Sequence, residues 1–188
     1  MRVAIVGAGL AGRWHAHAAR KAGASLIAIV DPDSEKARRL ATRLGGIQTY
    51  QSLTDMFSKQ KPEVIHICTP TKTHAELALQ AIGSGVAVML EKPMAQTFNE
   101  VQQLYEHARD RKVQLCPVHQ FLYQDGVKKI LSQRSLAGQI VHLEAVVHSA
   151  GGQGKAGTEL DEIAADILPH PLSLIQNFLP ENLPEQGW

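Results

Sequence analysis

The stretch Arg2-Val3-Ala4-Ile5-Val6-Gly7-Ala8-Gly9-Leu10-Ala11-Gly12 is a short apolar run that ends in a glycine-rich turn. The alanine-rich residues 14–21 that follow it are helical in character. A strand, a G-x-G-x-x-G turn and a helix in this order form the context in which the motif indicates dinucleotide binding. Gly7 permits the tight turn, Gly9 lets a pyrophosphate approach the backbone, and Gly12 allows the helix to pack closely on the strand.

The N-terminus of the predicted helix adds to this site, because its unpaired N–H groups are offered to phosphates. The turn is therefore expected to bind a cofactor through Gly7, Gly9, Leu10, Ala11 and Gly12.

Asp31 follows the next predicted strand, residues 25–30, and stands nineteen residues after Gly12. A carboxylate in this place can accept hydrogen bonds from an adenosine ribose, and its charge would repel a 2′-phosphate. We therefore expect Asp31 to bind the cofactor and NAD to be favoured, with NADP still possible. The alternative is that Asp31 caps the helix predicted from residue 33 to residue 44.

Strand-like and helical patterns alternate over residues 1–118. Beyond the first two strands, strands are predicted at 48–50, 64–68, 86–90 and 113–118, and helices at 35–44, 52–59, 73–84 and 99–112. The run at 64–68 is too apolar for an open sheet face, so it is expected to lie centrally in a parallel sheet. The alternation predicts an α/β fold with a Rossmann-type, doubly wound parallel sheet.

Two short motifs stand where predicted strands end: Thr69-Pro70-Thr71 and Glu91-Lys92-Pro93. Open α/β sheets bind ligands at the carboxyl ends of their strands, so we predict that Lys92 is the reactive centre and that Thr69 and Pro70 line the cofactor. A plain loop is nearly as good an interpretation of the Thr-Pro turn. An ion pair with Glu91 is a weaker alternative for Lys92, because neighbours on a strand point to opposite faces.

His74 lies in the first turn of the helix predicted from residue 73. It could face the cleft, although a surface position is the more usual outcome for a histidine there.

The organisation changes after residue 118. A helix is predicted at 125–132, a strand at 139–148, a glycine-rich loop at 151–157, and a helical stretch at 160–179 that Pro169 and Pro171 interrupt. We assign 1–120 to the dinucleotide-binding domain and 121–188 to a truncated α+β portion. A lone strand leaves unpaired N–H and C=O groups. We therefore expect it to pair with another copy of the chain or to be covered by the 160–179 helix, unless the chain is a shortened product.

Composition excludes several classes of function. Nineteen basic and eighteen acidic residues leave a net charge of +1, so no global field attracts nucleic acid or an anionic membrane. Cys68 and Cys116 fall in strand-like runs with no metal-ligand spacing, which favours buried free thiols in a reducing compartment and predicts no metal site. No leader pattern and no membrane-length apolar run is found, so a cytoplasmic protein is expected.

Taken together, these motifs resemble the Gfo/Idh/MocA oxidoreductases. The resemblance rests on the glycine turn with His15, on Thr69-Pro70 followed by His74, and on Gly85 leading to Glu91-Lys92-Pro93. The string Asp166-Ile167-Leu168-Pro169-His170 is similar to the family's later Asp-x-x-x-His element. The resemblance implies hydride transfer between NAD(P) and a sugar, polyol or cyclitol-like alcohol or ketone, with Glu91 and His74 also at the cofactor.

The resemblance further implies three catalytic roles. Lys92 would act near the substrate hydroxyl and the nicotinamide, Asp166 would orient, and His170 would be the acid or base. The chemistry agrees, because alcohol oxidation needs a base that titrates near working pH and a cation that stabilises the alkoxide. Asp166 and His170, four residues apart, could instead be a plain helical side-chain pair.

Two departures from the family pattern stand out. Residues 118–123 (VHQFLY) differ from the segment that many relatives carry after the sixth strand, and His119 is a weak candidate for a second proton-transfer group. The chain also stops soon after the Asp-His element, where family members continue into a sheet that walls the substrate site and forms subunit contacts. We expect a small-molecule substrate and a homo-oligomer. The alternatives are a non-catalytic dinucleotide-binding module and, with no residue selecting it, reduction of an imine or tetrapyrrole.

Overall fold

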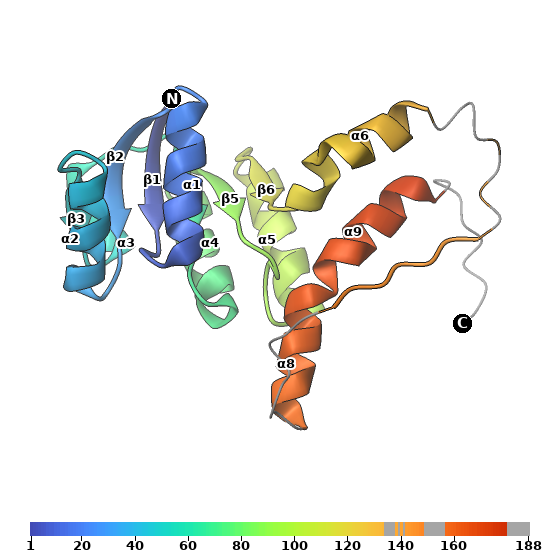
Figure 1. Ribbon diagram of the computed structural model, residues 1–188. Coiled ribbons are helices and arrows are strands. Elements are labelled where there is room, and N and C mark those ends of the chain that lie inside the picture. The colour runs from blue at the N-terminus through green and yellow to red at the C-terminus, as the bar shows by residue number, and fades with distance from the viewer. Residues whose placement is uncertain (134–137, 139, 141, 149–156, 180–188) are drawn as a thin grey trace. The chain divides into compact units, whose positions relative to one another are not determined.

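The computed structural model describes residues 1–133, 138, 140, 142–148 and 157–179. The chain divides into two compact units, Met1–Val118 and His119–Trp188, which are described one at a time (Figure 1).

The first unit is a six-stranded sheet with helices on both faces. Its strands are β1 (Arg2–Val6), β2 (Ser25–Val30), β3 (Gln48–Tyr50), β4 (Val64–Ile67), β5 (Ala87–Leu90) and β6 (Leu115–Pro117). All neighbouring strands are parallel, in the order β3-β2-β1-β4-β5-β6. This is the strand order of the dinucleotide-binding fold, and it confirms the predicted doubly wound sheet.

The helices of this unit are α1 (Leu10–Lys21), α2 (Ser34–Arg43), α3 (Leu53–Lys59), α4 (His74–Gly83) and α5 (Phe98–Asp110), with a 3₁₀ turn, η1, at Thr71–Thr73. Each begins and ends within a few residues of the predicted bounds. The largest difference is α1, which starts at Leu10, directly behind the glycine turn, and not near residue 14.

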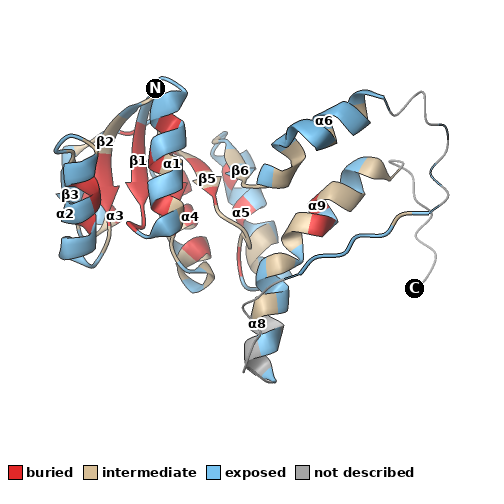
Figure 2. Cartoon of the chain, viewed as in Figure 1, coloured by how far each residue is buried: buried red, intermediate tan, exposed pale blue. Residues whose placement is uncertain are grey.

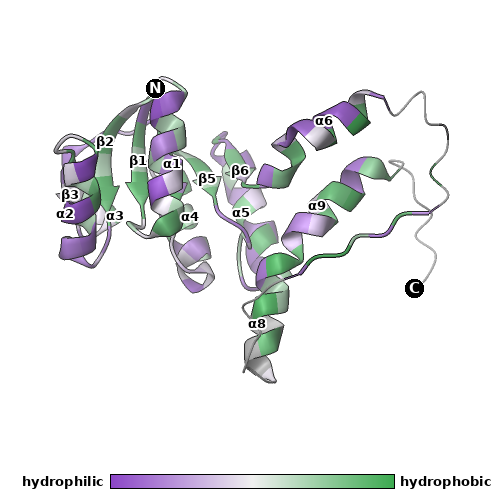
Figure 3. Cartoon of the chain, viewed as in Figure 1, coloured by the Kyte–Doolittle hydropathy of each residue, from purple (hydrophilic) through white to green (hydrophobic). Residues whose placement is uncertain are grey.

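Side-chain alternation along the strands assigns each helix to a face. Val3 and Ile5 of β1 pack with α1 and α2, whereas Ala4 and Val6 belong to the larger cluster with α3, α4 and α5. Figure 2 shows the buried residues concentrated in the central strands and on the inner sides of these helices, and Figure 3 shows that β1 and β2 are hydrophobic and that α2 is largely hydrophilic. Burying a side chain such as Ile5 contributes about 1.5–3 kcal/mol, so the sheet is a stable base for the loops at its edge.

Polar caps fix where the helices begin. Asp33 accepts hydrogen bonds from the backbone N–H groups of Glu35 and Lys36 and so caps α2. Thr97 and Glu100 form a reciprocal capping box at the start of α5. Because Asp33 is the cap of α2, the alternative interpretation of Asp31 as that cap is wrong.

The second unit contains a 3₁₀ turn, η2 (Gln120–Tyr123), and three described helices, α6 (Asp125–Ser132), α8 (Thr158–Ile167) and α9 (Pro169–Phe178). The predicted helical stretch at 160–179 is therefore two helices, since Pro169 and Pro171 lack the N–H groups that would continue the hydrogen-bond ladder.

The strand predicted at 139–148 is wrong for the residues described there. Residues 140 and 142–148 have no strand structure, and 139 and 141 lie outside the described residues. A strand exists only when a partner completes its ladder, and no pairing to this segment is found among the described residues. Ile140 and residues 142–145 instead line a cavity of about 330 Å³ with Leu174, Ile175 and Phe178 of α9.

The two cysteines differ in their exposure to solvent. Cys68 is buried as predicted, whereas Cys116 is exposed, because β6 is an edge strand whose residues are only partly covered. Over the described ranges, no cluster of three or more His, Cys, Asp or Glu side chains could hold a metal ion. In the same ranges, no helix is both long and apolar enough to cross a membrane.

Candidate active site

The glycine turn closes tightly between β1 and α1. Gly7 has a φ of +98°, and its N–H donates to the carbonyl oxygen of Val30 at 2.7 Å. A Cβ on Gly7 would lie 2.7 Å from the carbonyl oxygen of Cys68, and one on Gly12 would lie 1.8 Å from the carbonyl oxygen of Gly7. A Cβ on Gly9, by contrast, would meet no heavy atom within 4 Å. Gly7 and Gly12 thus serve backbone packing, while Gly9 leaves an open approach to the start of α1.

Asp31 lies beside this turn at the carboxyl end of β2. Its Oδ2 accepts the backbone N–H of Ala8 at 2.7 Å, and its Oδ1 accepts the N–H of Asp33 at 2.9 Å. These two bonds hold the carboxylate at the rim of the turn. Each oxygen retains a lone pair that can accept a further hydrogen bond from a hydroxyl group.

A cavity of about 830 Å³ opens at this edge of the sheet. It is lined by the glycine turn, the end of β2, the start of α3, the Thr-Pro turn and α4; among its residues are Gly7, Gly9, Asp31, Thr69, Pro70 and Thr73. β1 and β4 are neighbours in the sheet, and the strand order reverses between them. Ligands of open α/β sheets bind at this point, outside the carboxyl ends of the strands. Five predicted cofactor residues therefore line one cavity.

His74 lies behind the Thr-Pro turn, with a side chain that is 1% exposed. Its Nδ1 is 2.7 Å from the carbonyl oxygen of Pro93, and its Nε2 is 2.7 Å from that of Thr69. The ring therefore ties the turn after β4 to the turn after β5. The structure supports neither the surface position nor a place on the cleft wall, because the apolar packing of α4 takes this histidine inward.

Lys92 stands directly after β5, at the same edge of the sheet as Gly7 and Thr69, and its bond to Pro93 is cis. Its backbone N–H donates to Oε2 of Glu91 at 3.1 Å. The other oxygen of Glu91, Oε1, lies 2.9 Å from Nε2 of His15, a residue of α1. Glu91 thus fixes the lysine turn to the helix that starts at the glycine turn.

The carboxylate of Glu91 is held in its ionised form. Burial alone raises its pKa, but the hydrogen bond and charge of His15, with the backbone N–H of Lys92, lower the pKa below its usual value. Beyond His15, Nδ1 of His66 lies 3.2 Å from Nδ1 of His15. Burial, and secondly repulsion from His15, lower the pKa of His66 to about 4, so this ring is neutral at neutral pH.

His66 was not among the predicted site residues, and His15 entered only through the family resemblance. A signal for His66 exists in the sequence, because it is a titratable residue in the middle of the apolar run Val64-Ile65-His66-Ile67. Strand alternation sends Ile65 and Ile67 to the α4 face and His66 to the α1 face, where His15 lies. Cys68 lies at the end of the same run. Burial, and secondly the negative charge of Glu91, raise the pKa of its thiol, so the thiol is a poor nucleophile.

Asp166 and His170 belong to the second unit and are described within it. Asp166 is exposed near the end of α8, and His170 is half-buried in the first turn of α9. The His170 ring stacks on Phe121 with centroids 4.4 Å apart and planes at 14°. Because the chain turns from one helix into the next between them, the two residues are not a pair on one uninterrupted helix.

A sequence profile described as an oxidoreductase family with an NAD-binding Rossmann fold matches residues 1–119. This match covers more than half of the chain, over the part that forms the sheet and the cavity. The chain belongs to the Gfo/Idh/MocA family. The predicted family and the predicted NAD-type cofactor are thereby confirmed.

Among members of the Gfo/Idh/MocA family and solved structures, three similarities bear on the site. Inositol 2-dehydrogenase 4 of Saccharopolyspora erythraea is 38% identical over 96 residues, which are 50% of this chain and 28% of that protein. D-glucoside 3-dehydrogenase of Escherichia coli is 33% identical over 111 residues, 58% of this chain and 32% of that protein. The WlbA dehydrogenase of Bordetella pertussis, solved with NADH and UDP-GlcNAcA, has a TM-score of 0.67 at 25% identity, over 72% of this chain and 42% of that one.

The chain therefore spans less than half the length of each of these three proteins. The part that it shares with the Gfo/Idh/MocA family includes the glycine turn, Asp31, the Thr-Pro turn and Lys92. In the first unit, these residues lie just after the carboxyl ends of β1, β2, β4 and β5.

Proposed function

We propose that this chain binds NAD and takes part in hydride transfer between NAD and the secondary alcohol, or corresponding ketone, of a sugar, polyol or cyclitol. The cavity of about 830 Å³ carries the proposal, because the open approach at Gly9 and the carboxylate of Asp31 meet in it. The substrate class is supported by the similar proteins, which are named for inositol and glucosides or were solved with a nucleotide sugar.

The residues at the sheet edge fit a dinucleotide. Gly9 lets a pyrophosphate reach the N–H groups at the start of α1, including those of Leu10 and Ala11. Asp31 accepts hydrogen bonds from the adenosine ribose, and the turn at Thr69 and Pro70 lines the remainder of the cleft. When bound, NAD supplies the hydride acceptor.

The proton is handled by the chain itself. We assign His170 as the group whose ring nitrogen takes the hydroxyl proton, with Asp166 orienting the ring. The ammonium of Lys92 stabilises the developing alkoxide, which lowers the base strength required of His170. Glu91 supports Lys92 by anchoring its turn to His15. His119 is a second, weaker candidate for proton transfer.

We further propose that residues 1–120 form the dinucleotide-binding domain and 121–188 part of the substrate and assembly domain, in a cytoplasmic homo-oligomer with a small-molecule substrate. Exposed apolar side chains in the second unit support the assembly. Val146 and Val147 are 65% and 44% exposed in a segment without strand structure. A second copy of the chain would cover them and supply the missing strand partner.

Calorimetric titration of the chain with NADH, with its mass measured by light scattering, tests the proposal. We expect NADH binding and an oligomer and, in separate assays supplied with NAD⁺, a rise in NADH absorbance with members of a polyol and cyclitol panel. Lys92→Ala should remove the absorbance change and leave NADH binding intact. NADH binding without any substrate-dependent change, equal in wild type and Lys92→Ala, would instead identify a dinucleotide-binding module.

A further inference from the structure

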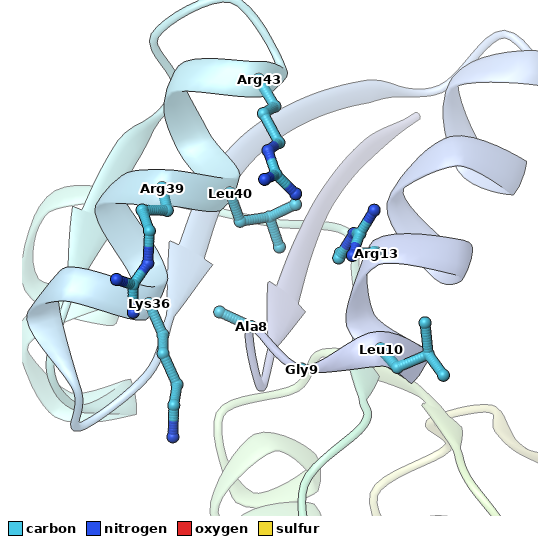
Figure 4. A pocket seen from close by; sticks show the side chains of 8 residues that line it. All are labelled: Ala8, Gly9, Leu10, Arg13, Lys36, Arg39, Leu40 and Arg43. Atoms are coloured by element: carbon cyan, nitrogen blue, oxygen red, sulfur yellow. The ribbon is translucent and has the colours of Figure 1, made fainter.

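His66 is a buried titratable residue in the middle of β4 that does not line the cofactor cavity. It is 6% exposed, and its Nδ1 lies 3.2 Å from Nδ1 of His15 on α1. The two rings do not stack; their centroids are 5.2 Å apart and their planes stand at 83°, so the rings meet at their edges. Arg13 lies on another side of α1, where it lines a small cavity with residues of α2 (Figure 4), because residues two apart are about 200° apart around a helix. The helix thus turns His15 toward the sheet and onto His66.

The space between the two Nδ1 atoms holds one proton. Two N–H groups facing each other at this distance repel, and two lone pairs form no bond, so one ring donates and the other accepts. Burial, and secondly repulsion from His15, lower the pKa of His66 to about 4, so His66 is a neutral ring at neutral pH. A neutral imidazole presents either an N–H or a lone pair at Nδ1, because its single proton can sit on either ring nitrogen.

The other nitrogen of His15 faces a group that can only accept. Its Nε2 lies 2.9 Å from Oε1 of Glu91, whose carboxylate is ionised, so Nε2 has to carry a proton. If this is the only proton on the His15 ring, Nδ1 of His15 accepts from His66. If the His15 ring carries two protons, its Nδ1 donates to His66. The neutral ring of His66 is able to complement both forms by changing its tautomer.

We propose that His66 is a positioning residue for Lys92. His66 keeps the Nε2–H of His15 directed at Glu91, and Glu91 accepts the backbone N–H of Lys92 through its second oxygen at 3.1 Å. The inference rests on the proposed function, in which Lys92 stabilises the alkoxide. Without His66, the ring of His15 is free to rotate, or to move its proton to Nδ1 and turn a lone pair toward the carboxylate. Such a loss matters because a displacement of about 1 Å in a catalytic group can lower the rate about 100-fold.

Two substitutions of His66 separate a positioning role from a packing role. His66→Asn keeps an amide near the place of Nδ1, and an amide donates through its nitrogen or accepts through its oxygen. His66→Leu keeps apolar bulk and does neither. In assays with NAD⁺ and a polyol that the wild type oxidises, kcat should fall about 10- to 100-fold in His66→Leu and stay within about 3-fold of wild type in His66→Asn. NADH affinity should change less than about 3-fold in both variants, since His66 lies outside the cofactor cavity.

Ile65→Val is the matched control. Ile65 is the preceding residue of the same strand, is fully buried, and packs in the cluster on the other face of the sheet. This substitution should lower the melting temperature slightly and leave kcat unchanged. The inference is overturned if His66→Leu keeps the kcat of wild type, or if His66→Asn loses as much kcat as His66→Leu does.

Nitrogen NMR of the wild type, labelled with ¹⁵N in its histidines, tests the inference without turnover and without a variant. Nε2 of His15 should carry a proton, and the Nδ1 atoms of His15 and His66 should be coupled through the proton that they share. A His15 ring without a proton on Nε2, or no coupling between the two rings, overturns the inference whatever the variants do. If His66→Leu does not fold, this spectrum decides.

Hydrogen exchange at the backbone amide of Lys92 separates the inference from the proposed function. If the chain binds NADH and oxidises no polyol, the proposed function fails. The amide of Lys92 should still exchange about 10-fold faster in His66→Leu than in wild type, with the amides of β1 unchanged, because its acceptor Glu91 is no longer held. Equal exchange at Lys92 in wild type and His66→Leu would show that His66 does not fix this turn.

Discussion

Replacing Gly9 and Gly12 separately by alanine tests whether these two glycines serve different purposes. A Cβ at position 12 would lie 1.8 Å from the carbonyl oxygen of Gly7 and 3.0 Å from its carbonyl carbon, which are backbone atoms that cannot rotate away. At position 9 the space is open, and the φ of −75° suits any residue. The same methyl group should therefore disturb the fold at position 12 and only the ligand site at position 9.

The magnitude for Gly12→Ala is the balance of two effects. Overpacking costs about 1–3 kcal/mol, and contact with fixed backbone places this site at the upper end, about 3 kcal/mol. Alanine returns up to about 1 kcal/mol because it favours the helical conformation of α1. A net loss of about 2 kcal/mol lowers the melting temperature of a chain of this size by roughly 4–8 °C. Gly9→Ala should stay within about 0.5 kcal/mol of wild type.

Thermal melting by circular dichroism and NADH titration together give the answer. Gly9→Ala should melt like wild type and bind NADH about 10- to 100-fold more weakly, because the methyl group blocks pyrophosphate from the backbone donors. Gly83→Ala, at a helical glycine with equally open surroundings but outside the cavity, is the control: it should leave NADH binding unchanged and melt no earlier than wild type. The reasoning is refuted if Gly9→Ala melts as early as Gly12→Ala, or if it binds NADH as tightly as wild type.

Three further predictions concern side chains at the sheet edge. The pKa of His66 is lowered from 6.5 to about 4, so the unfolded chain takes up a proton at a higher pH than the folded chain does. The free energy of unfolding is therefore at its full value above pH 6.5 and falls as the pH drops toward 4. By pH 5 it has decreased by about 2 kcal/mol. Urea melts at several pH values should show this loss in wild type and no such loss in His66→Gln. If the free energy of unfolding falls equally with pH in both proteins, other groups cause the loss. His74→Ala removes the buried ring that contacts the carbonyl oxygens of Thr69 and Pro93, and it should lower the free energy of unfolding by about 3 kcal/mol. A loss below about 1 kcal/mol would contradict the bridging role. Asp31→Ala should weaken NADH about 10-fold and NADPH less, and an unchanged affinity ratio would mean that the ribose is bound elsewhere.

The sequence was sufficient wherever neighbours along the chain decide the structure. The glycine turn, the alternating strands and helices and the position of Lys92 after β5 all follow from local patterns and from the handedness of parallel crossovers, so the sheet could be predicted without the coordinates. The predicted cofactor residues that line the larger cavity come from three separate strand ends. They could be brought together in advance because all strands of a parallel sheet present their carboxyl ends on one edge.

What could not be predicted depends on contacts between distant residues. His74 carries no sequence mark that separates a buried bridge from a surface histidine, because its two partners, Thr69 and Pro93, lie in different loops. The chain from His66 through His15 to Glu91 likewise joins β4, α1 and the end of β5. Cys116 was placed inside by its apolar neighbours, although exposure follows from the position of β6 at the edge of the sheet.

Residues 142–148 are a further part of the chain whose structure could not be predicted from local sequence. A strand was predicted at 139–148, following Gly138. An apolar segment forms a strand only when a second backbone accepts and donates its hydrogen bonds. The sheet of the first unit contains six such partners and forms as predicted. No strand that pairs with 142–148 is found among the described residues, so this segment lacks the contacts that a strand requires there.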